Sequence, residues 1–239
     1  MEKSEPKEIV LKGIGVSSGV ATGPVFLMTT EEDRVVERDI DEDEIAREIA
    51  RFEESLISTR HQIHEIQKQV EAALGPESAS IFDAHLLVVD DRALVEEVIR
   101  GLKVHKKNVE TVLRMVAERY AEALLKVQDD YLRERAVDVK DVTRRILRNL
   151  SGASSISLAQ LTTPHILVAN DLAPSEAAIL DKTKILGFAT DLGSPTSHTA
   201  IMARALGIPA AVGMHDISVR VTSGEPMLID GNTGVVLIH

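Results

Sequence analysis

The chain of 239 residues contains no cysteine and no tryptophan, and aromatic residues make up only 3% of it. The absence of cysteine excludes a disulfide framework and a thiolate metal site. Few aromatics and a formal net charge of −11 argue against nucleic acid, which requires stacking platforms and clustered positive charge. No apolar run approaches the length of a membrane span, and the charged start has no signal-peptide core. We therefore expect a soluble, cytoplasmic protein that binds neither nucleic acid nor membrane.

Glycine and proline are scarce between residues 31 and 150, which hold only Gly75, Gly101 and Pro76. This scarcity predicts a helical block. Its first apolar stripe recurs at three- and four-residue steps over residues 45–73, and Asp41 with Glu44 resembles a capping box. Because Gly75 and Pro76 end the stripe, we expect a helix of about 33 residues and roughly 50 Å.

Four further helices are expected in this block. One begins at Pro76, one passes through residues 94–98, one follows a cap at Asn108, and one spans residues 130–150. The block contains 28 acidic and 20 basic residues, so most of the negative charge belongs to it. An acidic helical surface favours a basic protein partner, although the residues alone are better explained by solubility.

Short apolar runs separated by turns characterise the two ends of the chain. Residues 9–28 are glycine-rich and strand-like, and a helix is expected at 175–180 after Pro174. Further strands are expected at residues 166–169, 185–190, 227–229 and 235–238. The sequence therefore predicts an α/β domain built from residues 1–30 and 151–239, interrupted by an all-α domain at 31–150.

His198 lies where the strand at 185–190 gives way to a helix over residues 199–206. Unpaired backbone N–H groups and the helix dipole make such a position suited to a phosphoryl group, and they keep an imidazole neutral and nucleophilic. Thr196 or Ser197 is expected to cap the helix, and Thr199 adds a hydroxyl. From local residue types alone, ordinary helix capping is the better explanation.

Residues 196–213, TSHTAIMARALGIPAAVG, resemble the phosphohistidine signature of phosphoenolpyruvate-utilising enzymes. That family includes Enzyme I of the bacterial sugar phosphotransferase system, pyruvate phosphate dikinase and phosphoenolpyruvate synthase. Residues 13–23, 81–85, 129–142 and 144–150 are similar to Enzyme I in particular. The resemblance implies a swivelling α/β phosphohistidine domain interrupted by a helical bundle that binds the small phosphocarrier protein HPr.

The same resemblance implies roles for individual residues. His198 would accept phosphate from phosphoenolpyruvate as a tele-phosphohistidine, supported by Thr196, Ser197 and Thr199, and pass it to a histidine of HPr in the first step of sugar uptake. Arg135 suits a phosphoryl group because a guanidinium binds one bidentately, although pairing with a nearby acid on its own helix is equally compatible. Positions matching the HPr-facing surface are Glu77, His85, Leu86, Leu87, Asp91, Leu94, Leu124, Tyr131 and Arg135. Leu86 and Leu94 fit core positions as well, so they rank below His85 and Arg135.

The resemblance also implies what this chain lacks. In the family a phosphoenolpyruvate- and Mg²⁺-binding barrel follows this region, so we expect a fragment without its own metal site. Its partners would be HPr and that carboxy-terminal domain, through which the parent would form a homodimer. Two departures stand near the histidine: Gly193-Ser194-Pro195 replaces a common Gly-Gly-Arg, and Ala177 replaces a hydroxyl residue. A dikinase- or synthase-like domain and a non-enzymatic helical scaffold remain as alternatives.

Overall fold

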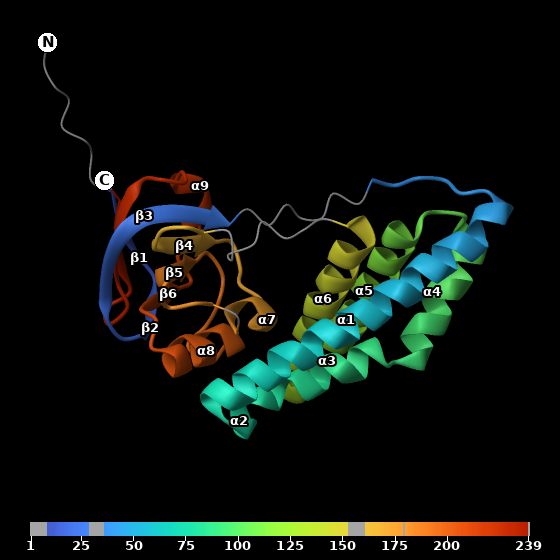
Figure 1. The fold of residues 1–239 in the computed structure, drawn as a ribbon, viewed down its shortest axis with the longest axis horizontal. Coiled ribbons are helices and arrows are strands. Elements are labelled where there is room, and N and C mark those ends of the chain that lie inside the picture. Colours follow the sequence, from blue (N-terminus) through green and yellow to red (C-terminus); the bar gives the residue numbers. More distant parts are fainter. Residues whose placement is uncertain (1–8, 29–35, 153–160, 179, 239) are drawn as a thin grey trace, which may run out of the picture. The chain divides into compact units, whose positions relative to one another are not determined.

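The computed structural model describes residues 9–28, 36–152, 161–178 and 180–238, apart from the side chains of Asp130, Tyr131, Glu134, Pro174 and His198. The chain divides into two compact units, Met1–Glu31 with Ile156–His239 and Glu32–Ser155 (Figure 1). Within the described residues, every strand belongs to the first unit and the six helices α1 to α6 belong to the second. The predicted fold class, an α/β sheet interrupted by a helical insert, is confirmed.

The α/β unit is built on one eight-stranded sheet in the order β1-β8-β7-β3-β4-β5-β6-β2. Strands β3 to β6 run parallel to one another, and the remaining pairs are antiparallel. The strands are β1 (Ile9–Lys12), β2 (Ile14–Ser17), β3 (Val20–Met28), β4 (His165–Ala169), β5 (Ile185–Thr190), β6 (Ala210–Val212), β7 (Pro226–Asp230) and β8 (Val235–Ile238). The three-residue strand β6 was not predicted, because so short a run carries no periodicity.

The two edge strands, β1 and β2, are separated by the single residue Gly13, so the edges of the sheet meet and the sheet curls back on itself. The turn between β7 and β8 crosses this junction, where Gly13 N–H donates to Gly234 O at 2.9 Å. A Cβ added at Gly15 would lie 2.4 Å from Gly231 O. Glycine is required here because two backbones lie in direct contact.

Two helices pack on the curled sheet and fix the strand that leads to the candidate site. Helix α8 (His198–Leu206) contacts β2 and β6, and α9 (Ile217–Arg220) contacts β4 and β5. Strand alternation separates Ile166 and Val168 on one face from Leu167 on the other. The core on the first face consists of Val25, Ile166, Val168, Ala189, Ala211, Met214, Ile217, Val221, Met227, Ile229, Val236 and Ile238.

The helical unit begins as the sequence predicts. Asp41 and Glu44 form the capping box, with Asp41 N–H donating to the Glu44 carboxylate at 3.0 Å, and Gly75 ends the first long helix with a φ of 87°. The helices are η1 (Glu42–Glu44), α1 (Ile45–Leu74), α2 (Pro76–Ala79), α3 (Ile81–Val89), α4 (Arg92–His105), α5 (Val109–Leu125) and α6 (Asp130–Ser151). The helix predicted from Pro76 is thus divided into α2 and α3, and α7 (Pro174–Ala177) is shorter than the predicted helix at 175–180.

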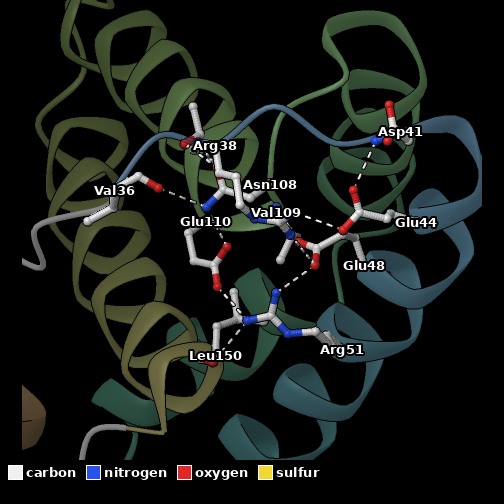
Figure 2. A network of polar contacts seen from close by, with 11 residues as sticks. Val36, Arg38, Asp41, Glu44, Glu48, Arg51, Asn108, Val109, Glu110 and Leu150 are labelled. Atoms are coloured by element: carbon white, nitrogen blue, oxygen red, sulfur yellow. Dashed lines mark hydrogen bonds and ion pairs between the residues drawn. The ribbon is translucent and has the colours of Figure 1, made fainter.

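The start of α5 depends on a side chain from another helix. Asn108 occupies the predicted cap position, but its Oδ1 accepts from Arg38 N–H at 3.0 Å instead of capping the helix. Val109 N–H donates to Glu48 of α1 at 2.8 Å, and Arg51 donates to Glu48 at 2.7 Å and to Leu150 O at 3.2 Å (Figure 2). This network joins α1 to the start of α5 and the end of α6.

Candidate functional site

The candidate site lies at the start of α8, after β5 and a loop. Ser197 has extended backbone and caps the helix, because its Oγ accepts from Ala200 N–H at 3.2 Å. His198 is the first helical residue; its backbone is described and its side chain is not. In a helix the first N–H groups lack intrahelical acceptors, and Ser197 satisfies only that of Ala200. The backbone N–H groups of His198 and Thr199 are therefore placed to bind an anion.

The loop before Ser197 packs closely against β6 at Gly193. Gly193 has a φ of 117°, and a Cβ there would lie 3.0 Å from the Val212 side chain. The hydroxyls of Ser194 and Thr196 lie 3.2 Å apart, and both residues are exposed. Ser197 N–H donates to Ser194 O at 3.1 Å, which closes a turn before the helix.

Arg204 holds this loop from the last turn of α8. Its Nη1 donates to Pro195 O and to Val16 O, each at 3.2 Å. Pro195, which the resemblance marks as a departure, thus contributes a carbonyl that connects the loop to the end of β2. Arg204 lies within residues 196–213. Its role was not predicted from the sequence, because both acceptors are backbone carbonyls, which every residue type has.

Thr199 does not provide the expected hydroxyl at the anion position. Its side chain is 7% exposed and donates to Leu172 O at 2.6 Å, ahead of α7. The hydroxyl is therefore committed to holding α8 against the segment that leads into α7. Ala177, the other departure, is completely buried at the end of α7. Of the three expected supporting residues, Ser197 caps α8, Thr196 is exposed and Thr199 turns inward.

A second buried polar residue, Asp191, was not predicted and fixes the strand that carries the loop. It directly follows β5 and accepts from Ser218 N–H at 3.0 Å and from Asn170 Nδ2 at 3.1 Å, and it is also bonded by the Ser218 hydroxyl. These partners lie on α9 and after β4. Asp191 therefore anchors the end of β5 between two other elements of the unit.

The expected partner-facing residues of the helical unit divide by exposure. Glu77 and Leu87 are exposed, and Leu86, Asp91, Leu124 and Arg135 are partly exposed. The side chain of Tyr131 lies outside the described residues. Asp91 also caps α4, since it accepts from Ala93 N–H at 2.8 Å.

His85 and Leu94 are corrected by the structure, because both are buried and cannot reach a partner directly. His85 is 1% exposed; its ring stacks edge-on against Phe82, with centroids 5.4 Å apart. Its Nε2 lies 3.3 Å from Asp138 and 3.7 Å from Asp141 of α6. The expected ranking of His85 above Leu86 is therefore reversed for surface contact.

Arg135 takes part in the pair within its own helix that its spacing allows. Its Nη1 lies 3.5 Å from the Asp138 carboxylate, one helical turn further along α6, and about a quarter of its side chain is exposed. The pair leaves the guanidinium at the border between interior and surface.

Among the described residues, no group of three or more His, Asp or Glu side chains is arranged to hold a metal ion. Among the helices that the structure describes, none has the length and hydropathy needed to cross a membrane.

Comparison with protein families assigns both parts of the chain. Residues 12–135 match the family described as PEP-utilising enzyme, N-terminal, and residues 161–234 match the PEP-utilising enzyme, mobile domain. The second match contains the whole loop and helix around His198, together with β4 to β7.

Curated relatives agree with this assignment. The chain is 35% identical over 230 residues to the phosphoenolpyruvate-protein phosphotransferase of Haemophilus influenzae and 38% identical over 229 residues to that of Listeria monocytogenes. Each alignment covers 96% of this chain and 40% of the relative. The chain therefore spans less than half the length of these relatives.

Solved structures of similar length share the fold. An NMR solution structure of Enzyme I is 39% identical, with a TM-score of 0.78 over 96% of this chain and 92% of the other. A structure described as the N-terminal domain of Enzyme 1 - Nitrogen is 27% identical, with a TM-score of 0.68 over 95% of this chain and 93% of the other. The chain belongs to the phosphoenolpyruvate-utilising enzymes and corresponds to the N-terminal part of Enzyme I.

Proposed function

We propose that this chain is the phosphate-carrying part of a phosphoenolpyruvate-protein phosphotransferase, with His198 as the carrier. The observation that carries this proposal is the place of His198 as the first residue of a helix capped by Ser197, within the matched mobile domain. Free backbone N–H groups at that point bind the phosphoryl oxygens, and the helix dipole disfavours the imidazolium form.

The reaction consists of two displacements at phosphorus. In the full enzyme the neutral Nε2 of His198 attacks the phosphoryl group of phosphoenolpyruvate, the bond to the enolate oxygen breaks, and the enolate takes up a proton to give pyruvate. A histidine of HPr then attacks the phosphohistidine and His198 regains its neutral ring. The segment 193–197, held by Arg204, keeps the helix start in place during both steps.

The helical unit is proposed to dock HPr through its accessible residues. Glu77, Leu87 and Arg135 reach the surface, and the excess of acidic residues in this unit attracts a basic partner. Arg135 is proposed to neutralise the phosphoryl group during transfer, which a planar guanidinium does bidentately. The chain would act in the cytoplasm, together with a carboxy-terminal phosphoenolpyruvate-binding domain.

Two incubations test the proposal. The chain is mixed with phospho-HPr in one tube and with labelled phosphoenolpyruvate and Mg²⁺ in another, and phosphate is located by mass spectrometry under conditions that preserve phosphohistidine. We expect label on His198 in the first tube and none in the second, because no group of three or more His, Asp or Glu side chains among the described residues is arranged to hold the Mg²⁺. Label in the second tube would show that the chain takes phosphate directly from phosphoenolpyruvate and would contradict this expectation.

Two variants serve as controls. His198→Ala should take up no phosphate, and His61→Ala, which removes an exposed histidine on α1, should behave as the parent chain does. Phosphate on any other histidine would remove His198 from the mechanism.

A titration separates this proposal from a carrier domain of the dikinase or synthase type. HPr is added to the ¹⁵N-labelled chain while amide shifts are recorded. Shifts confined to α2, α3, α5 and α6 support HPr as the partner, and the absence of any shift would favour the other type of enzyme.

A further inference from the structure

A buried polar cluster joins α3 to α6 beneath the surface proposed to dock HPr. It contains the imidazole of His85 and the carboxylates of Asp138 and Asp141, and each of the three residues is more than nine-tenths buried. The His85 Nε2 faces Asp138 Oδ1 at 3.3 Å and Asp141 Oδ2 at 3.7 Å. Two carboxylates and one imidazole thus converge in the interior.

Asp138 connects this interior cluster to the surface. Its Oδ1 faces His85, while its Oδ2 lies 3.5 Å from the Nη1 of Arg135. The buried carboxylate therefore stands between a fixed ring and a guanidinium that is partly exposed. The arrangement resembles a second-layer carboxylate that orients a functional side chain in an active site.

Burying two carboxylates beside an imidazole is costly, because each polar group loses its contact with water. Apolar side chains would join α3 to α6 without this desolvation cost, so packing alone does not account for the cluster.

We propose that Asp138, buried against the ring of His85, is a positioning residue that fixes the guanidinium of Arg135 for phosphoryl transfer. This inference rests on the proposed function, in which Arg135 meets the phosphoryl group. Arginine loses substantial rotamer freedom when it binds, so a guanidinium held beforehand by Asp138 binds the phosphoryl group with a smaller entropic loss. Misplacement of such a group slows transfer by up to about a hundredfold.

The first test measures the Arg135 side chain itself. ¹⁵N relaxation of its Nε–H group is compared between the parent chain, Asp138→Asn and Asp43→Asn, which changes an exposed aspartate near the start of α1. We expect a clear fall in the order parameter of Arg135 in Asp138→Asn and none in Asp43→Asn. An Arg135 side chain that stays equally ordered in both variants would overturn the proposal.

The second test is a double-mutant cycle on transfer from phospho-HPr. Asp138→Asn should slow the transfer step about 10- to 100-fold with less than about a threefold change in HPr affinity. In an Arg135→Gln background the same substitution should have almost no further effect, because Asp138 acts through Arg135. Two independent, multiplying losses would show a structural effect and overturn the proposal.

A conservative variant keeps the test decisive if Asp138→Asn fails to fold. Asp138→Glu retains the carboxylate and displaces it by one methylene, so transfer should fall between the parent and Arg135→Gln, with an amide spectrum like that of the parent. Parent-like transfer by Asp138→Glu would then overturn the proposal. Failure of the parent chain itself to take phosphate from phospho-HPr would instead reject the proposed function.

Discussion

Three neighbouring hydroxyls around His198 have different tasks, although their residue types are nearly equivalent. Ser197 caps α8, Thr196 stays exposed beside Ser194, and Thr199 is buried against Leu172 O. The difference follows from helix geometry, since Ser197 precedes the helix and Thr199 lies on its inner face. Single substitutions should therefore separate stability from phosphate uptake.

Thr199→Val should lower the free energy of unfolding by about 1–3 kcal/mol, because Leu172 O loses its buried donor while side-chain volume is kept. Urea unfolding measured by circular dichroism checks this value. Thr199→Ser keeps the hydroxyl and should lose clearly less. An equal loss in the two variants would show that the methyl group matters and the hydrogen bond does not.

Glu48 provides a second prediction at this scale. It is 2% exposed, accepts from Val109 N–H and pairs with Arg51 (Figure 2). Glu48→Gln keeps an oxygen and loses the charge, so the helical unit should lose about 1–2 kcal/mol, a value reduced because Arg51 is one third exposed. The matched control is Glu65→Gln on the same helix.

Glu65 pairs with Lys68 on the exposed side of α1, where such pairs contribute less than about 0.5 kcal/mol. Thermal unfolding of both variants gives the comparison. If Glu65→Gln lost as much stability as Glu48→Gln, the burial of Glu48 would make no additional contribution to stability.

At the scale of elements, the closure of the sheet depends on glycines at the junction of β1 and β2 with the β7–β8 turn. A Cβ at Gly231 would lie 2.0 Å from Ser17 O and 2.8 Å from Ala210 N, and neither backbone atom can move aside without displacing a strand. The helix end at Gly207 is different, since its φ is 66° but no atom lies within 4 Å of an added Cβ.

Alanine at these two glycines should therefore have unequal effects. Gly207→Ala should cost about 1–2 kcal/mol of left-handed strain, and Gly231→Ala should cost more, at least about 3 kcal/mol, because it also displaces a strand. Denaturant midpoints and the dispersion of amide signals from β2 and β6 measure both. Comparable losses of stability in the two variants would show that the junction accommodates an added Cβ.

At the scale of the whole molecule, carboxylates in both units have a pKa below the usual value. A hydrogen bond from Thr233 lowers the pKa of Asp230, one from Thr222 lowers that of Glu225, and one from Lys106 lowers that of Glu42. A carboxyl whose pKa is lower in the folded state than in the unfolded state stabilises the fold. This stabilisation is complete at pH values above the unfolded pKa, which is 3.8 for Asp and 4.5 for Glu. This stability is lost as the pH falls through the folded pKa.

Both units should therefore become less stable as the pH drops below 4.5, the ordinary value for Glu. In Asp230→Asn an NH₂ group replaces one of the two carboxylate oxygens, so the side chain cannot accept from Asn232 and Thr233 on separate oxygens, and the variant should be less stable than the parent at neutral pH. That difference should narrow in acid as the parent carboxyl takes up a proton. Calorimetry over a pH series measures it, with Asp43→Asn as control. A difference independent of pH would assign the effect to geometry instead of charge.

At high pH, stability depends on a lysine whose pKa is raised. Hydrogen bonds from Lys107 to Asp39 and Glu37 raise its pKa from 10.5 to about 12. Its contribution is complete below the unfolded value of 10.5 and is lost as the pH rises through about 12. The charged pairs thus favour the folded state between the two limits.

The sequence by itself determined the helical insert, the capping box at Asp41 and Glu44, the end of α1 at Gly75 and the helix that begins at His198. Each depends on residues within a few positions of one another, so periodicity and residue type carry the information. The same local reasoning limited the cap to Thr196 or Ser197, and the resemblance of residues 196–213 indicated the family.

Only the tertiary structure decided which polar side chains turn inward. Glu48 accepts from Val109 N–H across 61 positions, Thr199 donates to a carbonyl 27 positions away, and His85 faces Asp138 from another helix. A buried polar group is defined by the partner that satisfies it, and that partner is distant in sequence. Local pattern therefore identified where His198 stands, and packing decided which groups hold its surroundings.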